Sequence, residues 1–127
     1  MGTVKTQKSK LWGSLLTGGL VIFSMTAFGQ TAKTVKGEIL DMSCYMTHDA
    51  QGKGHKTCAQ GCLDKGLPAG ILSKDDGQVY LLVEDHKLSD AYKEAVKHAA
   101  ENVEITGKVV KKNGVQSLIV EKVKVSG

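Results

Sequence analysis

The feature that most constrains the fold is a strand pattern that recurs five times and is interrupted once by a helical pattern. Short segments of alternating or clustered apolar residues, bounded by turn residues, indicate β-strands at residues 33–40, 69–73, 78–84, 102–111 and 115–125. Between the third and fourth of these, residues 88–100 place apolar side chains at three- and four-residue steps, which predicts an amphipathic helix. The chain is therefore expected to be mainly β.

Turn and glycine positions indicate how the strands connect and bend. Residues 75–77 (Asp-Asp-Gly) predict a turn between the second and third strands, and Asn113-Gly114 predicts a type I′ hairpin between the last two. Gly37 and Gly107 lie within strands, where glycine indicates a bulge or a close approach of two backbones. Five strands with a helix between the third and fourth is the element order of the OB-fold, a partly open barrel. An open α+β sheet with the helix on one face is the alternative.

The N-terminus predicts export. A segment with three lysines precedes an apolar run over residues 11–28, and residues 27–29 (Ala-Phe-Gly) provide a cleavage site before Gln30. This layout is typical of a secretory signal peptide over residues 1–29. We therefore expect a periplasmic or extracellular protein with no stable membrane span after cleavage. An uncleaved membrane anchor is the alternative.

These features together resemble small exported bacterial proteins with an OB-like fold, most of them of unknown function. The resemblance covers residues 33–125 and rests on the element order, the export signal and phrases such as Val-Glu-Ile-Thr-Gly at residues 103–107. It implies a single domain over residues 30–127: a five-stranded, OB-like, partly open barrel with a helix between strands 3 and 4. A Cys-rich helical insert would lie between strands 1 and 2. The resemblance supplies no catalytic residues.

Composition excludes several function classes. The chain has 17 lysines and no arginine, and the part after residue 29 has 14 lysines against 13 acidic residues and only three aromatic residues, all tyrosines. Nucleic-acid binding normally uses aromatic stacking, a basic groove and Arg forks, so no nucleic-acid partner is expected. No CxxCH motif, glycine-rich phosphate loop or nucleophile motif occurs in the sequence, so haem, nucleotide and catalytic sites are not expected either.

The distinctive chemistry lies in residues 42–62, MSCYMTHDAQGKGHKTCAQGC, which hold every cysteine of the chain. Thr57 and Gln60 match a capping box and Gly66 a helix C′ residue, which predicts a helix in the second half of this stretch. Cys58 and Cys62 would then share one helix face, with Cβ atoms about 6 Å apart. A disulfide needs about 3.5–4.5 Å between Cβ atoms, so a direct bond between them is disfavoured.

Three interpretations of this stretch follow. The first is a soft-metal site in which three thiolates and one imidazole form the tetrahedral set that suits Zn(II). Neighbouring methionines would move the preference towards Cu(I), and a nearby carboxylate could orient a ligand histidine. The candidate ligands are Cys44, Cys58, Cys62 and either His55 or His48, with Asp41, Met42 and Met46 as their neighbours.

The other two interpretations need no metal. An exported protein usually oxidises its cysteines, so one disulfide from Cys44 to Cys58 or to Cys62 is the second, although it leaves one thiol unpaired. A thiol oxidoreductase, with Cys58 activated at a helix N-terminus, is the third. The sequence favours a non-catalytic binding module with a Cys/His metal site, whose partner is an unidentified protein or small ligand.

Overall fold

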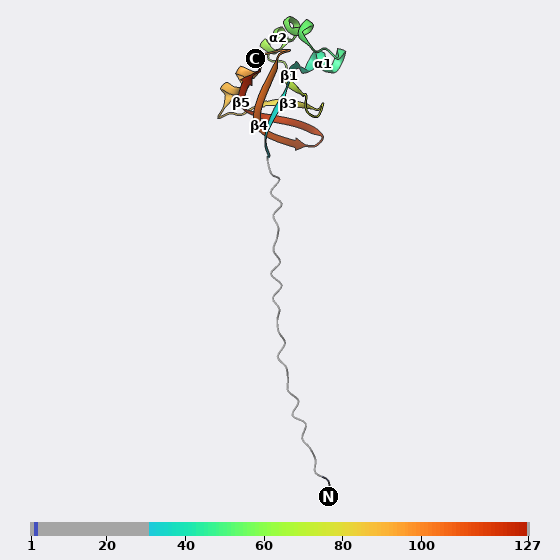
Figure 1. Cartoon of the computed structure of the whole chain (residues 1–127), viewed down its shortest axis with the longest axis vertical. Helices are drawn as coiled ribbons and strands as arrows, with labels where there is room; N and C mark the ends of the chain where they lie inside the picture. The colour runs from blue at the N-terminus through green and yellow to red at the C-terminus, as the bar shows by residue number, and fades with distance from the viewer. Residues whose placement is uncertain (1, 3–30, 127) are drawn as a thin grey trace.

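The structure is a computed structural model that describes Gly2 and residues 31–126 (Figure 1). Five strands form a barrel: β1 (Thr31–Asp41), β2 (Ala69–Ser73), β3 (Val79–Glu84), β4 (Asn102–Lys112) and β5 (Val115–Val125). The helices are α1 (Met42–His48), the 3-10 helix η1 (Lys53–His55), α2 (Lys56–Asp64) and α3 (Ser89–Ala95). Apart from Gly2, the predicted export signal at residues 1–29 lies outside the described residues.

The strands have the expected order, but they close the barrel completely. The sequence around the barrel is β1-β2-β3-β5-β4, with β4 paired back to β1; only β3 and β5 run parallel. The prediction of a partly open barrel is therefore wrong, as is the alternative of an open sheet. Closure follows from the length of β1, whose residues 31–38 pair with β4 while its residues 37–41 pair with β2.

Gly37 and Gly107 allow the long strands to bend, as the sequence predicts. A Cβ atom at Gly37 would lie 2.0 Å from the carbonyl oxygen of Leu72, and one at Gly107 would lie 1.9 Å from that of Ile119. The pairing of β4 with β5 also shifts register between Thr106 and Gly107, which marks a bulge. Both glycines therefore mark places where two backbones come together more closely than any side chain permits.

The core is formed by the inward faces of the strands and by small side chains from the helices. Its larger members on the strands are Val35, Ile39, Ile71, Tyr80, Leu82, Val103, Ile105, Leu118 and Val120, each at most 4% exposed. Ala59 and Leu63 of α2, Ala69 of β2, Ala95 of α3 and Ala99 complete the cluster. No cysteine or histidine belongs to this cluster among the described residues, so the barrel packs independently of them.

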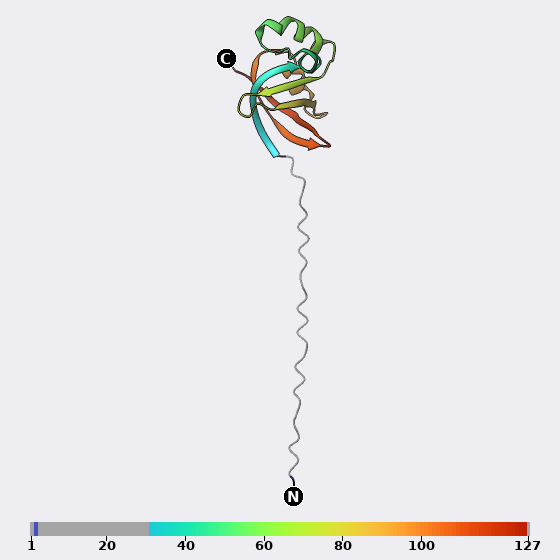
Figure 2. The same ribbon diagram turned by 90° about the vertical axis from the view of Figure 1, so that its right-hand side faces the viewer.

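The helices differ from the predicted ones in number and extent. α3 lies between β3 and β4 along the chain, as expected, but it ends at Ala95 because the chain turns there to bring Ala99 beside Ile39 of β1. The backbone N–H of Ala100 donates to the carbonyl oxygen of Ile39 at 2.8 Å. Two further helices precede α2 in the insert, residues 42–68, which sits over one end of the barrel (Figure 2). Among the described helices, none has the length and apolar character to cross a membrane.

A charged network joins the insert to the segment after α3. Lys56 of α2 pairs with Glu101, which pairs with His98 at 2.8 Å, and His98 also pairs with Glu94 at 3.1 Å. Lys97 contacts Glu94 from the exposed side at 3.1 Å. The hydrogen bond to Glu101, followed by that to Glu94, raises the pKa of His98 above its ordinary value of 6.5 despite partial burial.

This network makes a pH dependence of stability testable. Because its folded pKa is raised, protonated His98 stabilises the fold fully below about pH 6.5, and this contribution is lost as the pH rises through the folded value. His98→Gln should therefore lower the free energy of unfolding by about 0.5–1 kcal/mol more at about pH 5.5 than at about pH 8.5. Urea unfolding at low salt measures this, with exposed His86→Gln as the control; equal losses at both pH values would contradict it.

Candidate metal centre in the insert

Asp41 turns the chain from β1 into the insert. Its side chain is 1% exposed and accepts hydrogen bonds from the backbone N–H groups of Ser43 at 3.0 Å and Cys44 at 3.3 Å. This is the bonding of a helix N-cap, so α1 begins directly at Met42. The first half of the cysteine stretch is therefore helical rather than an extension of the strand.

The helical geometry separates Cys44 from the two methionines. At about 100° per residue, Met42 and Met46 lie about 40° apart around α1, whereas Cys44 lies about 160° from each of them. Met42 instead packs on β2, where a Cβ atom at Gly70 would lie 2.3 Å from its sulfur, and Met46 is 72% exposed. The methionines therefore do not share a helix face with Cys44, and the preference for Cu(I) that their closeness in sequence suggests loses that support.

α2 begins two residues earlier than predicted, at Lys56, and Gln60 has a different role. His55 is its N-cap, without a side-chain cap bond, so the predicted capping box with Thr57 is wrong. The amide nitrogen of Gln60 donates to the carbonyl oxygen of Val96 at 2.8 Å, and its oxygen accepts from the backbone N–H of Ala99 at 3.2 Å. Gln60 thus bonds α2 to the segment after α3 instead of capping the helix.

The end of α2 follows the prediction. Gly66 has a φ of 84°, in the left-handed region that suits a C′ glycine. The N–H of Gly66 donates to the carbonyl oxygen of Leu63 at 2.9 Å, and that of Leu67 donates to Cys62 at 3.2 Å. These two bonds form a Schellman motif, which fixes where the helix that carries Cys58 and Cys62 stops.

Folding of the insert brings most of the predicted ligands together, in two groups that share Cys44. Ligand atoms of Cys44, His55 and Cys58 lie within 4.8 Å of one another, and so do those of Asp41, Cys44 and Cys62. The sequence predicts one set of three cysteines and a histidine; in the structure Cys62 faces the buried carboxylate of Asp41 instead. All three cysteines are free thiols.

The two candidate histidines have different surroundings. His55 is the last residue of η1 and is half-buried, and its Nε2 atom is buried without a hydrogen-bond partner within the described part of the chain. His48 lies exposed in the last turn of α1 and belongs to neither group. The sequence spacing leaves the two equal, and the structure distinguishes them in favour of His55.

Asp41 influences the protonation of the two thiols beside it in the group of Asp41, Cys44 and Cys62. Burial acts to raise the pKa of Asp41, but hydrogen bonds from the Cys44 thiol and from the backbone of Ser43 and Cys44 outweigh it, so the pKa is lowered. The same carboxylate raises the pKa of Cys44 to about 12. The pKa of Cys62 is raised by burial first and then by Asp41.

These raised pKa values keep Cys44 and Cys62 protonated near neutral pH in the metal-free protein, so neither of these two cysteines is an activated thiolate there. Of the site residues, Asp41 is the one whose role is hardest to infer from the sequence. The signal for an N-cap is its position three residues before Cys44, because an N-cap side chain accepts a hydrogen bond from the backbone of residue N3.

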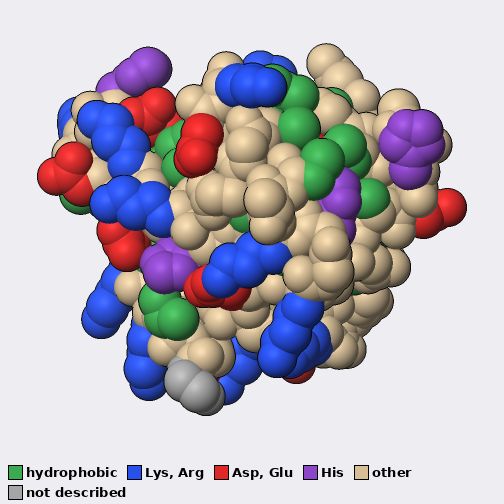
Figure 3. All heavy atoms as spheres, turned by 90° about the horizontal axis from the view of Figure 1, so that it is seen from above, with side chains coloured by type: hydrophobic (Ala, Val, Ile, Leu, Met, Phe, Trp, Pro, Cys, Tyr) green, Lys and Arg blue, Asp and Glu red, His purple; other side chains and the backbone are tan. Residues whose placement is uncertain are grey.

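The site lies at the solvent surface. Cys58 is exposed, and Cys44, His55 and Cys62 are half-buried. Figure 3 views the molecule from the end that carries the insert and shows histidine beside side chains of the hydrophobic class, in which cysteine is counted. A metal ion bound here would therefore lie near water rather than inside the barrel.

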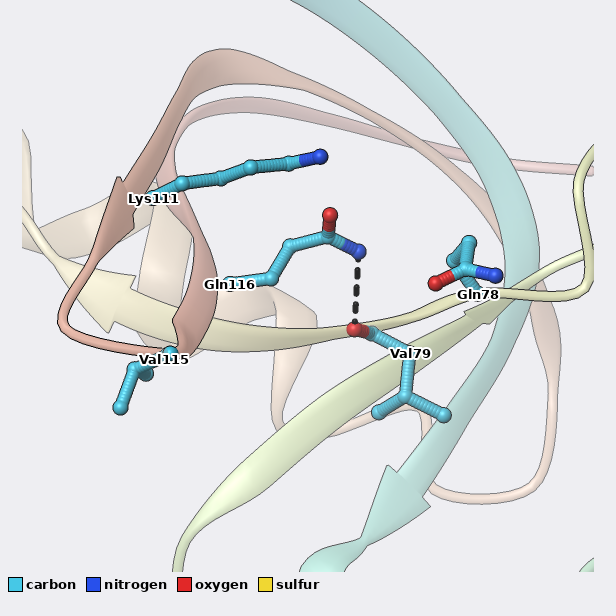
Figure 4. Close-up of a pocket in the computed structure, with 6 residues that line it drawn as sticks. Gln78, Val79, Lys111, Val115 and Gln116 are labelled. Atoms are coloured by element: carbon cyan, nitrogen blue, oxygen red, sulfur yellow. Dashed lines mark hydrogen bonds between the residues drawn. The ribbon is translucent and has the colours of Figure 1, made fainter.

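Two hollows elsewhere on the surface lack comparable chemistry. One, of about 510 Å³, lies by the β4–β5 hairpin and is lined by Gln78, Val79, Lys111, Gly114, Val115 and Gln116 (Figure 4). In it, Gln116 donates to the carbonyl oxygen of Val79 at 3.2 Å. The other, of about 530 Å³, lies beside the insert, where Lys53 and Lys56 face Glu38 and Glu101, so its charges balance.

The molecule is thus a small β-barrel whose insert brings cysteine and histidine side chains close to one another and to Asp41 at the end of β1. Its distinctive chemistry lies in that insert and not in the barrel core. No known family model and no curated protein matches the chain.

Proposed function

We propose that this protein is an exported, non-catalytic binding module that holds one soft metal ion, Zn(II) or Cu(I), at Cys44, His55 and Cys58. The observation that carries the proposal is the buried Nε2 atom of His55, which has no hydrogen-bond partner among the described residues. A buried polar atom left unsatisfied costs about 1–3 kcal/mol, and a bond to a metal ion would remove that cost.

The donor set supports this choice of metals. Thiolate and imidazole are the usual ligands of Zn(II), and thiolate is also favoured by Cu(I). With Zn–S bonds of about 2.3 Å, sulfur atoms in a tetrahedral site lie about 3.8 Å apart. The ligand atoms of Cys44, His55 and Cys58 already lie within 4.8 Å of one another, so small side-chain rotations would complete the site.

The group of Asp41, Cys44 and Cys62 is a weaker candidate for a metal site. Both carboxylate oxygens of Asp41 accept backbone hydrogen bonds, and the thiols of Cys44 and Cys62 lie close to the same carboxylate. These groups are therefore satisfied without an ion. We assign Asp41 the role of positioning Cys44 and ordering α1, and not that of a ligand.

The histidines provide a matched test. The purified, reduced protein is titrated with Zn(II) and, in a second series, with Cu(I), and the bound ion is counted by native mass spectrometry and elemental analysis. We expect one equivalent of bound metal in the wild type and in His48→Ala. In His55→Ala the metal affinity should be lower by about 100-fold or more, because mutation of residues that only support a ligand already lowers the affinity by about 10–100-fold.

Two results would contradict the proposal. One is the absence of stoichiometric metal with either ion, and the other is equal affinity in the two histidine variants. Non-reducing peptide mapping of the same preparation before reduction tests the alternative. A homogeneous bridge from Cys44 to Cys58 or to Cys62 would support a metal-free barrel whose insert is fastened by one disulfide.

A further inference from the structure

We infer that the bound metal has an open coordination position beside Cys58 and Gly61 on the exposed side of α2, through which it is passed to an acceptor that bears thiolate ligands. This inference rests on the proposed function and names what that site does with its ion. Three features of the insert carry it: the fold's independence of the metal, the number of available ligands, and the exposure of one edge of the site.

The fold does not need the metal. Ala59 and Leu63 attach α2 to the barrel core, at 1% and 5% exposed, and Gln60 bonds to the segment after α3. The Schellman motif ends the same helix independently of any ligand. An ion that is not required to hold the structure together can leave without unfolding it, which distinguishes this site from a structural zinc site.

The site offers three ligands and not four. Cys44, His55 and Cys58 form one group, while the Cys62 thiol lies beside the buried carboxylate of Asp41 in the other. Structural zinc sites are closed by four protein ligands, whereas sites with three protein ligands keep a position for an external one. The present arrangement is of the second kind.

The exposed edge of the site is clear of side chains. Cys58 is exposed, whereas Cys44 and His55 are half-buried. Gly61 lies one turn beyond Cys58, about 60° away around α2. A Cβ atom at Gly61 would meet no atom of the described protein within 4 Å, its own helix backbone aside, and the residue has no positive φ. Neither packing nor backbone geometry requires a glycine here, although it costs about 1 kcal/mol relative to alanine within a helix.

This clearance allows transfer by ligand exchange. An acceptor thiolate forms a bond to the metal at the open position, and the bond between the metal and the Cys58 sulfur then breaks. Cys58 takes up a proton from water, and the bonds to His55 and Cys44 break in the same way as the acceptor supplies further ligands. The oxidation state of the metal does not change. The acceptor is therefore a protein or peptide with at least two cysteines.

Kinetics distinguish an open site from a closed one. Protein loaded with Zn(II) is mixed with increasing concentrations of a reduced peptide that contains two cysteines, and the zinc that has left the protein is followed by native mass spectrometry. We expect the transfer rate to increase in proportion to peptide concentration, because the peptide attacks the bound metal directly. A rate independent of peptide concentration would overturn the inference, since the ion would then leave only by unassisted dissociation.

Variants at Gly61 and Cys62 locate the open position. Gly61→Leu should slow the transfer about tenfold at unchanged Zn(II) affinity by covering the exposed edge, whereas Gly61→Ala should change it little. Cys62→Ser should leave the rate unchanged. Equal transfer rates in the two Gly61 variants, or much faster transfer from Cys62→Ser, would overturn the inference. If these variants still bound stoichiometric zinc, the proposal that the protein binds a metal would nevertheless stand. Circular dichroism verifies that each variant is folded.

Discussion

Cys44→Ser should abolish metal binding by the insert, with an affinity for Zn(II) or Cu(I) lower by about 100-fold or more. Cys44 is the residue that the two groups of potential ligands share, so no set of three remains when its sulfur is removed. A serine hydroxyl stays protonated near neutral pH and is a hard donor, which suits neither of the two ions. The loss should therefore exceed that from any other single cysteine.

The same variant should leave the fold intact. Cys44 is half-buried, lies on a helix that buries none of its residues, and makes no contribution to the core cluster. Serine keeps the backbone N–H that donates to Asp41, so the N-cap of α1 survives. We expect the free energy of unfolding of the metal-free protein to change by no more than about 0.5 kcal/mol.

Cys62→Ser is the matched control, since Cys62 is also half-buried and also lies beside Asp41. It should retain one equivalent of metal with an affinity within about tenfold of the wild type. Competition against a chelator of known affinity measures both variants. If Cys44→Ser retained tight binding, or if Cys62→Ser lost as much as Cys44→Ser, the assignment of ligands would be wrong.

The scaffold is predictable from the sequence because its signals are local. Asn113-Gly114 forms the expected tight hairpin, with positive φ at both residues. Val35 and Ile39 both point into the core, as alternation requires. Gly37 marks a close backbone approach, also as predicted. Each of these features is encoded within a few neighbouring residues.

Closure of the barrel depends on residues far apart in the chain. That β1 pairs with both β2 and β4 is a property of three strands together, and no single segment encodes it. The start of α1 is different, because its signal is local. Met42, Cys44 and Met46 alternate as they would in a strand, but the adjacent N-cap at Asp41 makes the segment helical.

In the candidate metal site, too, some features can be predicted from the sequence and others depend on the folded structure. Clustering of the cysteines in sequence indicates a shared site, and the structure brings Cys44 and Cys58 together around His55. The choice between His48 and His55 depends on η1 and on burial in the insert, neither of which the spacing of the two histidines encodes. The position of Cys62 beside Asp41 is likewise set by the packing of α2 over the end of β1.

Gly37→Ala should destabilise the fold by about 2–4 kcal/mol, a large part of the roughly 5–15 kcal/mol expected for a domain of this kind. The added Cβ atom would lie 2.0 Å from the carbonyl oxygen and 2.7 Å from the carbonyl carbon of Leu72. Both atoms belong to backbone that is held in the pairing of β1 with β2, so neither can move aside as a flexible side chain would. Relief requires the two strands to separate where β1 passes from β4 to β2.

The same substitution at Gly61 is the control, and it should have the opposite sign. Gly61→Ala adds its methyl group to open space on α2 and should stabilise the helix by up to about 1 kcal/mol, because alanine loses less backbone entropy than glycine on folding. Thermal unfolding of the metal-free protein should therefore separate the two variants by roughly 10–25 °C. A Gly37→Ala variant as stable as Gly61→Ala would mean that β1 and β2 can move apart without loss, and that the closed barrel is not a rigid support for the insert.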